Sequence, residues 1–316
     1  MKSYYLGADI GGTNSNLCLI EIFSDNFKIL YSRNFETKKY DNIIDIINLF
    51  NSEIVNKYRI LIISGVLAIA GQIEEDKIET PNVELKIDKK EIKAKTSLKH
   101  LEIINDFTAI SYSVEKLEEN QLKNINKSKS KNSSLPVLII GAGTGLGKSI
   151  ILQNKNIVLK SEGGHCDFAP QNKEEFELIE FIKKHNKIKT VEIEDLVSGK
   201  GIENIYYFLS KKHMSAKEIS ENKKKDKNCK KTFELFYIFY ARACKNFALD
   251  IMTNEIYLAG GIITKNISFS KKVFMSEFTN SQNYQSYLKN ISINIITDYN
   301  SSLIGLGNYI LKNNNN

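Results

Sequence analysis

Residues 100–109, HLEIINDFTA, join a short apolar run to a polar pair and then to a second apolar run. Residues 101–104 predict a buried strand, and residues 107–114 have the pattern of a helix. Asn105 and Asp106 therefore stand at the carboxyl end of a strand, where open α/β sheets place ligands and catalytic groups. A carboxylate there can accept a proton from a substrate hydroxyl while the neighbouring amide binds the next hydroxyl. The alternative interpretation is that Asp106 only caps the following helix.

A second polar group follows an apolar run near the start of the chain. Residues 3–9 predict a strand that leads into a glycine turn, and residues 17–22 predict a second strand. Two glycines between strands let the backbone approach an anion, and Asp9 beside them can position Mg²⁺ through water. A tight hairpin turn without a ligand explains the same residues. The turn residues are Gly11, Gly12, Thr13 and Asn14.

The next part of the chain has the patterns of a meander, a helix and a strand. Its apolar residues alternate or run continuously where strands are expected and recur at helical spacing elsewhere. The predicted elements are strands at residues 27–35 and 60–70 and helices at residues 41–58 and 89–95.

The opening pattern recurs after residues 118–134, a polar stretch that predicts a linker or a surface excursion. Strands are predicted at residues 137–140, 149–152 and 157–159, and a glycine turn follows the first of them. Two copies of strand, glycine turn, strand and strand predict duplicated halves that face each other across a cleft. The candidate ligand-binding residues of this turn are Gly141, Gly143, Thr144 and Gly145.

The second glycine turn also matches a relaxed phosphate-binding P-loop over residues 142–149, which end in Gly-Lys-Ser. A P-loop runs directly into a helix whose N-terminus holds the phosphates. Here Ser149 begins a β-branched, apolar run that an Asn-Lys-Asn turn interrupts, so the sequence favours a hairpin.

Residues 161–170, SEGGHCDFAP, form another candidate site. The doubled glycine lets Glu162 and His165 project from one tight loop. A carboxylate accepts hydrogen bonds and an imidazole can donate or accept them, so both suit sugar hydroxyls. Metal ligation by His165 is the alternative, although no cysteine or histidine partner lies at ligand spacing.

The rest of the chain predicts mainly helices. The apolar stripe of residues 230–252 is typical of core packing. A strand at residues 255–259 ends in Gly260 and Gly261, a third glycine turn that could leave bare backbone beside an adenine or a ribose. The other predicted elements are helices at residues 174–184, 202–209 and 302–311 and a strand at residues 291–297.

Size and composition set broad limits on the protein class. A length of 316 residues favours two domains, and 42% hydrophobic with 26% charged residues is ordinary for a globular protein. The net charge of +7 is spread through a lysine-, asparagine- and isoleucine-rich chain, so nucleic acid is not an expected partner. The four cysteines form no C-x-x-C pair. No apolar run approaches the roughly 18 residues of a membrane span, so we expect a cytoplasmic protein without a membrane partner.

Six motifs, in order and spacing, resemble those of the bacterial glucokinase family over essentially the whole chain. They are DxGGTN at residues 9–14, NDF at 105–107, GxGTGxG at 141–147, EGGHxDFAP at 162–170, ExxxSG at 194–199 and AGGI at 259–262.

The resemblance implies an α/β architecture, the actin-like, ribonuclease H-like ATPase fold, with two domains around a central cleft. It places residues 1–105 and 299–316 in a small domain and residues 106–298 in a large one. It implies a cytoplasmic homodimer that transfers the γ-phosphoryl group of Mg-ATP to the 6-hydroxyl of glucose, at the start of glycolysis.

The resemblance also assigns site residues, with Asp106 as the catalytic base. Asp9 would serve the Mg²⁺ region through water, with no direct side-chain ligand to the metal. The glucose ligands implied are Asn82, Asn105, Asp106, Glu162, His165 and Glu194. The residues implied at ATP are Asp9, Gly11, Gly12, Thr13, Asn14, Gly141, Gly143, Thr144, Gly145, Gly260 and Gly261.

Four features depart from the family's pattern. Asn16 replaces a common arginine, Gln72 a proline and Pro81 a threonine, and the tryptophan that often follows the asparagine at Asn82 is absent. These departures concern the wall of the sugar pocket and the sugar preference more than the phosphoryl transfer itself. Two alternatives stay open, a kinase for another hexose or with another phosphoryl donor, and a non-catalytic sugar sensor on the same fold. A sensor would be expected to lack the base or a phosphate loop, and the sequence has both.

Overall fold

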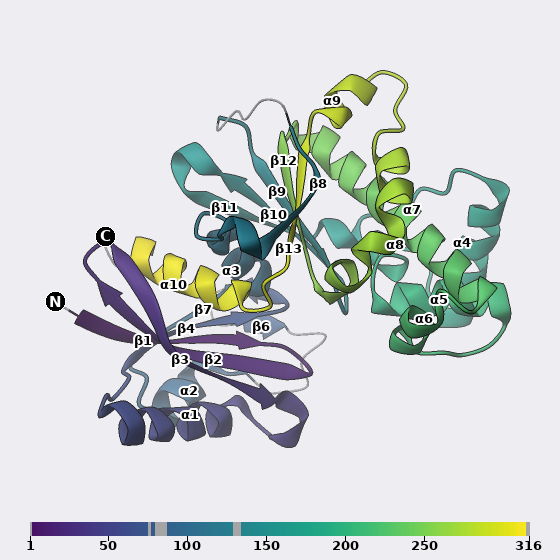
Figure 1. The fold of residues 1–316 in the computed structure, drawn as a ribbon. Coiled ribbons are helices and arrows are strands. Elements are labelled where there is room, and N and C mark those ends of the chain that lie inside the picture. The colour runs from purple at the N-terminus through teal and green to yellow at the C-terminus, as the bar shows by residue number, and fades with distance from the viewer. Residues whose placement is uncertain (1, 75–76, 80–86, 129–133, 314–316) are drawn as a thin grey trace. The chain divides into compact units, whose positions relative to one another are not determined.

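The computed structural model describes residues 2–74, 77–79, 87–128 and 134–313. The chain forms two compact units, Met1–Glu119 with Asp298–Asn316, and Asn120–Thr297 (Figure 1). The first unit therefore extends past residue 105, the predicted end of the small domain. The reason is that the helix after residue 105 packs against the C-terminal helix of the same unit.

The first unit contains a five-stranded sheet in the order β3-β2-β1-β4-β7. The first three strands form an antiparallel meander, and β4 and β7 extend the sheet in parallel to β1. The strands are β1 (Lys2–Ile10), β2 (Asn14–Phe23), β3 (Asn26–Glu36), β4 (Ser64–Ile69) and β7 (His100–Asn105).

Helices cover both faces of this sheet (Figure 1). Because side chains alternate along a strand, Leu17 and Leu19 pack toward one face and Cys18 and Ile20 toward the other. The helices on the first face are α1 (Ile43–Tyr58) and α2 (Lys89–Lys95), and those on the second are α3 (Asp106–Ser113) and α10 (Ser301–Asn313).

The second unit repeats this strand order as β11-β10-β9-β12-β13 and adds β8 at the edge. The pairings are again antiparallel in the meander and parallel from β9 to β12 and β13. The predicted duplication is therefore confirmed, and the hairpin between β9 and β10 confirms the rejection of the P-loop. The strands are β8 (Leu122–Asn126), β9 (Val137–Ala142), β10 (Leu146–Leu152), β11 (Ile157–Ser161), β12 (Glu255–Ala259) and β13 (Ser292–Ile296).

A long helix, α7 (Lys227–Ile251), provides much of the second unit's core. Its Arg242 donates two hydrogen bonds to the Glu175 carboxylate of α4, at 2.8 and 3.2 Å, and one to Glu277 of α8. These buried charges are paired, which offsets their loss of hydration. The other helices are α4 (Lys173–Asn186), α5 (Gly199–Ser210), α6 (Ala216–Asn222), α8 (Gly261–Phe278) and α9 (Gln285–Lys289).

Short elements complete both units. Two short strands pair with each other, and 3₁₀ helices occupy several turns. They are β5 (Gln72–Glu74), β6 (Lys77–Glu79), η1 (Thr37–Lys39), η2 (Glu119–Gln121), η3 (Gln153–Lys155), η4 (Gly163–His165) and η5 (Ile193–Asp195).

Two expectations for secondary structure were wrong. The strand predicted over residues 60–70 begins only at Ser64, because its neighbour β7 begins opposite that residue, and Leu61 before it is 64% exposed. The stretch at 118–134, predicted to be a linker or a surface excursion, contains β8, which pairs antiparallel with β13. This pairing joins segments far apart in the sequence, so the local polar composition did not indicate it.

Candidate functional site

Polar residues of the first unit gather at the carboxyl ends of its parallel strands. Ile10 of β1 is opposite Ile69 of β4, and Ile69 is opposite Asn105 of β7. The glycine turn after β1 and the pair Asn105–Asp106 at the end of β7 therefore lie at the same edge of the sheet, which is the usual position of ligands in parallel sheets.

Asn105, not Asp106, is the N-cap of α3. Its Oδ1 accepts a hydrogen bond from the Phe107 amide at 2.9 Å, and its Nδ2 donates to the Gly71 carbonyl at 3.2 Å. Asp106 is the first residue of the helix, and its Oδ1 also accepts from the Phe107 amide, at 2.9 Å. Because Asn105 already provides the cap, helix capping does not by itself explain the carboxylate at Asp106.

The turn between β1 and β2 is a closed hairpin supported by a residue that the sequence did not reveal. The Gly11 amide donates to the Asn14 carbonyl at 2.9 Å. Thr37 donates to the Gly11 carbonyl through its hydroxyl and to the Thr13 carbonyl through its amide, at 2.8 and 2.9 Å. Thr13 and Asn14 are exposed, so the hairpin interpretation and a ligand-binding role are compatible.

Asp9 lies just before this turn and is held by the C-terminal helix. The Ser302 hydroxyl donates to its Oδ2 at 2.6 Å. Burial raises the pKa of the Asp9 carboxyl, and the hydrogen bond from Ser302 opposes that rise. The neutral carboxyl is therefore favoured more than usual until a positive charge comes near.

Three loops of the second unit meet at the carboxyl end of β9: the β9–β10 turn, η4 and η5. The Glu194 carboxylate of η5 accepts a hydrogen bond from the Leu146 amide at 3.0 Å. An added Cβ at Gly145 would lie 2.7 Å from Glu194 Oε2, so the turn needs glycine there for this approach. The Gly143 carbonyl accepts from the Gly199 amide at 2.8 Å, which joins the turn to α5.

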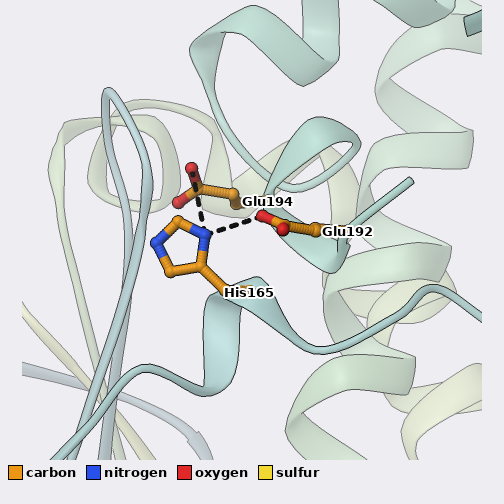
Figure 2. Close-up of side chains that lie close together, drawn as sticks. All are labelled: His165, Glu192 and Glu194. Carbon is orange, nitrogen blue, oxygen red and sulfur yellow. Dashed lines mark hydrogen bonds and ion pairs between the residues drawn. The ribbon is translucent and has the colours of Figure 1, made fainter. Parts of the chain in front are cut away.

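His165 stands among carboxylates (Figure 2). Its Nδ1 lies 2.7 Å from Glu192 Oε2 and 3.9 Å from Glu194 Oε1, and its Nε2 lies 4.0 Å from Glu162 Oε2. The hydrogen bond with Glu192 raises the pKa of His165, burial opposes the rise, and the charges on Glu194 and Glu162 add to it. The side chain is 48% exposed and so accessible to a ligand.

Sequence reasoning missed Glu192. Main-chain hydrogen bonds between Phe168 and Val191, and between Ile193 and Cys166, both at 2.9 Å, bring its loop against η4. A signal was present in the alternation of buried Val191 and Ile193 with the half-buried Glu192 and Glu194.

The same residues have the spacing of a cation site. Ligand atoms of His165, Glu192 and Glu194 all lie within 4.8 Å of one another. The direct hydrogen bond between His165 and Glu192 and the amide bound by Glu194 account for this spacing without a metal.

The third glycine turn lies beside the second. Ala259 of β12 is opposite Gly141 of β9, and Gly260 has a φ of 97°, a conformation that favours glycine. A Cβ at Gly260 would lie 2.4 Å from the Ala142 carbonyl oxygen, whereas one at Gly261 would meet nothing within 4 Å. Exposed Thr144 lies at the tip of the neighbouring turn.

The predicted sugar ligands fall in two groups, with Asn105 and Asp106 in the first unit and Glu162, His165 and Glu194 in the second. Asn82 lies outside the described residues, as do Pro81 and the side chain of Gln72. Asn16, the remaining departure, lies on β2 opposite Asp9 and accepts a hydrogen bond from Asn34 at 2.6 Å. Among the described residues, no helix is long and apolar enough to span a membrane.

Gly164→Ala tests whether the close contact between η4 and β10 positions the residues of η4. The new Cβ would lie 2.2 Å from the Leu146 carbonyl oxygen, so η4 must move away from β10. Overpacking of this kind costs about 1–3 kcal/mol of stability. We also expect KM for a sugar to rise about tenfold, because Glu162 and His165, the predicted sugar ligands, move with η4. Kinetics and thermal unfolding measure both effects. Gly199→Ala is the control, because its Cβ makes an ordinary 3.5 Å contact, and equal behaviour of the two variants would refute the argument.

The duplicated sheets, with glycine turns at their carboxyl ends, have the actin-like ATPase fold, and the relatives of the chain make it an ATP-dependent sugar kinase. A family model described as glucokinase matches residues 6–313. The chain therefore belongs to the glucokinase family, and it is a phosphotransferase.

Individual relatives agree with this assignment. The chain is 30% identical to a glucokinase of Erwinia tasmaniensis, with 98% of each chain covered. A solved glucokinase structure from an Antarctic psychrotroph is 26% identical, covers 98% of this chain and 99% of its own, and has a TM-score of 0.81. The structure of glucokinase from Balamuthia mandrillaris in complex with glucose has a TM-score of 0.83 at 23% identity, over 98% of this chain and 94% of its own, and supports the fold.

Proposed function

We propose that this chain transfers the γ-phosphoryl group of ATP to the 6-hydroxyl of glucose, with Asp106 as the base. The observation that carries the proposal is the position of Asp106, in the first turn of α3 at the carboxyl edge of the sheet, beside a cap residue that already satisfies the helix. Phosphoryl transfer depends on alignment and charge neutralisation more than on covalent chemistry. Asp106 accepts the hydroxyl proton as the bond to phosphorus forms.

The proposed sugar ligands of the second unit differ in their hydrogen-bonding roles. Glu162 and Glu194 accept hydrogen bonds from hydroxyls, and His165 can donate or accept through Nε2. Within the described part of the chain, Asn105 Nδ2 donates one proton to the Gly71 carbonyl. In this proposal its second amide proton is donated to a sugar hydroxyl. Asn82 completes the proposed set by resemblance to the family.

The glycine turns serve the nucleotide in this proposal. Main-chain amides of the two turns suit phosphate oxygens, and the residues proposed there are Gly12, Thr13 and Asn14 in one unit and Gly141, Thr144 and Gly145 in the other. Gly11 and Gly143 shape the turns instead, because their amides donate to the Asn14 and Gly145 carbonyls. Gly260 and Gly261 border the adenosine, where the open space at Gly261 allows close approach.

Asp9 fits a role at Mg²⁺ through water. Burial disfavours its charged form, and a nearby cation would offset that cost. Mg²⁺ supplies neutralisation of the phosphate charge when it is bound. Asp9, whose Oδ2 accepts a hydrogen bond from Ser302, would hold the ion through water.

The oligomeric state, the cellular compartment and the pathway are also proposals, and they rest on the family resemblance. We expect a homodimer that acts in the cytoplasm at the first step of glycolysis. Light scattering on the purified protein tests the oligomeric state, and a monomer at micromolar concentration would contradict that part.

A hexose panel tests the proposed substrate. Initial rates of sugar-dependent ADP release should be highest with glucose and lower with mannose and N-acetylglucosamine. A higher kcat/KM with another hexose would reassign the substrate. Glucose binding by calorimetry without turnover on any sugar or donor would favour the sensor.

A further inference from the structure

Glu192 is the nearest carboxylate to His165, and it belongs to none of the motifs that identify the family. Its Oε2 lies 2.7 Å from His165 Nδ1, whereas the closest atom of Glu194 lies 3.9 Å from that nitrogen. Figure 2 shows these two carboxylates beside the ring. The closest atom of Glu162 lies 4.0 Å from Nε2. Asp167 and Glu192 also form an antiparallel β-bridge, so the main chain fixes this carboxylate against the loop that carries His165.

The hydrogen bond determines what each ring nitrogen can do. With the Nδ1 proton donated to Glu192, the ring orientation is fixed and Nε2 is the nitrogen left for a ligand. The 4.0 Å separation between Nε2 and Glu162 Oε2 is too long for a hydrogen bond, so Glu162 does not occupy that nitrogen.

We propose that Glu192 is a positioning residue for sugar binding, which holds His165 as an oriented imidazolium whose Nε2 proton is donated to a sugar hydroxyl oxygen. The inference rests on the proposed role of His165 at the sugar. Among the described residues, the charged groups that face the ring are Glu194 of η5 and the two residues that precede η5 and η4, Glu192 and Glu162. All three carboxylates favour the protonated ring.

The proposal predicts the sign of a pH effect. The pKa of His165 is raised, so the donor at Nε2 persists to a higher pH than an unperturbed histidine would allow. Above that pKa the remaining ring proton stays on Nδ1 toward Glu192, and Nε2 changes from donor to acceptor. The KM for glucose should therefore rise as the pH passes the His165 pKa, with kcat less affected.

Glu192→Gln is the test, because the amide keeps the shape and an acceptor oxygen but removes the charge. NMR titration of the four histidines, with His165 assigned from a His165→Gln variant, should show a lower pKa for His165 in Glu192→Gln. We expect KM for glucose at pH 7.5 to rise about tenfold, because His165 then loses its charge and with it the charge-assisted hydrogen bond from Nε2 to the sugar. The rise in KM should begin at a lower pH than in the wild type, and kcat should change by less than about twofold.

Glu180→Gln is the matched control, since Glu180 is an exposed carboxylate of α4 paired only with Lys183 among the contacts described. An unchanged His165 titration in Glu192→Gln would overturn the proposal. A higher KM whose pH dependence matches that of the wild type would also overturn the proposal, because it would indicate loss of structure alone. The titration uses the free protein, so it tests Glu192 even if the wild type proves inactive on glucose, an outcome that would instead refute the proposed function.

Discussion

Asp106→Asn should lower kcat for glucose phosphorylation by about 10²-fold or more, the typical contribution of a positioned general base. The substitution removes the proton acceptor but keeps an oxygen that can accept from the Phe107 amide, as Asp106 Oδ1 does at 2.9 Å. Asn105 still caps α3. The dissociation constant of glucose should therefore change by less than about threefold, and kcat by far more. A coupled rate assay and calorimetry measure the two quantities.

A matched control separates chemistry from the loss of a helix-terminal charge. Asp45 lies in the first turn of α1 in the same unit, so Asp45→Asn removes a similar favourable interaction with a helix N-terminus. We expect its kcat to stay within about twofold of the wild type. A near-wild-type kcat in Asp106→Asn would remove Asp106 from the role of base.

Gly305→Ala should destabilise the first unit by about 3 kcal/mol or more, at or above the upper end of typical overpacking. The new Cβ would lie 1.7 Å from the Ala109 carbonyl oxygen of α3, so α10 and α3 must separate. Their contact also contains the hydrogen bond from Asn308 to the Tyr112 carbonyl, at 2.8 Å. Because α3 begins with Asp106, kcat should fall together with stability.

Urea unfolding compares this variant with Gly261→Ala. A Cβ at Gly261 meets nothing within 4 Å, so that substitution should leave stability unchanged or raise it by up to about 1 kcal/mol through helix propensity. Equal urea midpoints for the two variants would show that α3 and α10 can separate at little cost in free energy. This result would contradict the close packing of the two helices.

Much of the fold was predictable because its signals are local. At residues 9–14 and 141–147 a glycine turn lies between two apolar runs and marks a hairpin, and this recurrence indicated the duplicated sheets. What failed depends on pairing between distant segments. Leu61 has the hydrophobicity of a buried strand residue but is exposed, and the polar segment at β8 gains its structure from β13.

The candidate site divides in the same way. The glycine turns and the pair Asn105 and Asp106 follow from strand ends and residue chemistry, and Glu194 entered through the resemblance to the family. Ser302, Thr37 and Glu192 were missed because their partners, Asp9, Gly11 and His165, lie 293, 26 and 27 residues away along the chain. Only the folded structure brings such residues together.

Identification of the reaction product tests the central claim most directly. The purified protein should be incubated with Mg-ATP and uniformly ¹³C-labelled glucose, and the products followed by ³¹P and ¹³C NMR. The account predicts equimolar ADP and glucose 6-phosphate, with the phosphoryl group on the 6-oxygen. Phosphate on another oxygen, or ADP accumulating with inorganic phosphate and unmodified glucose, would contradict it.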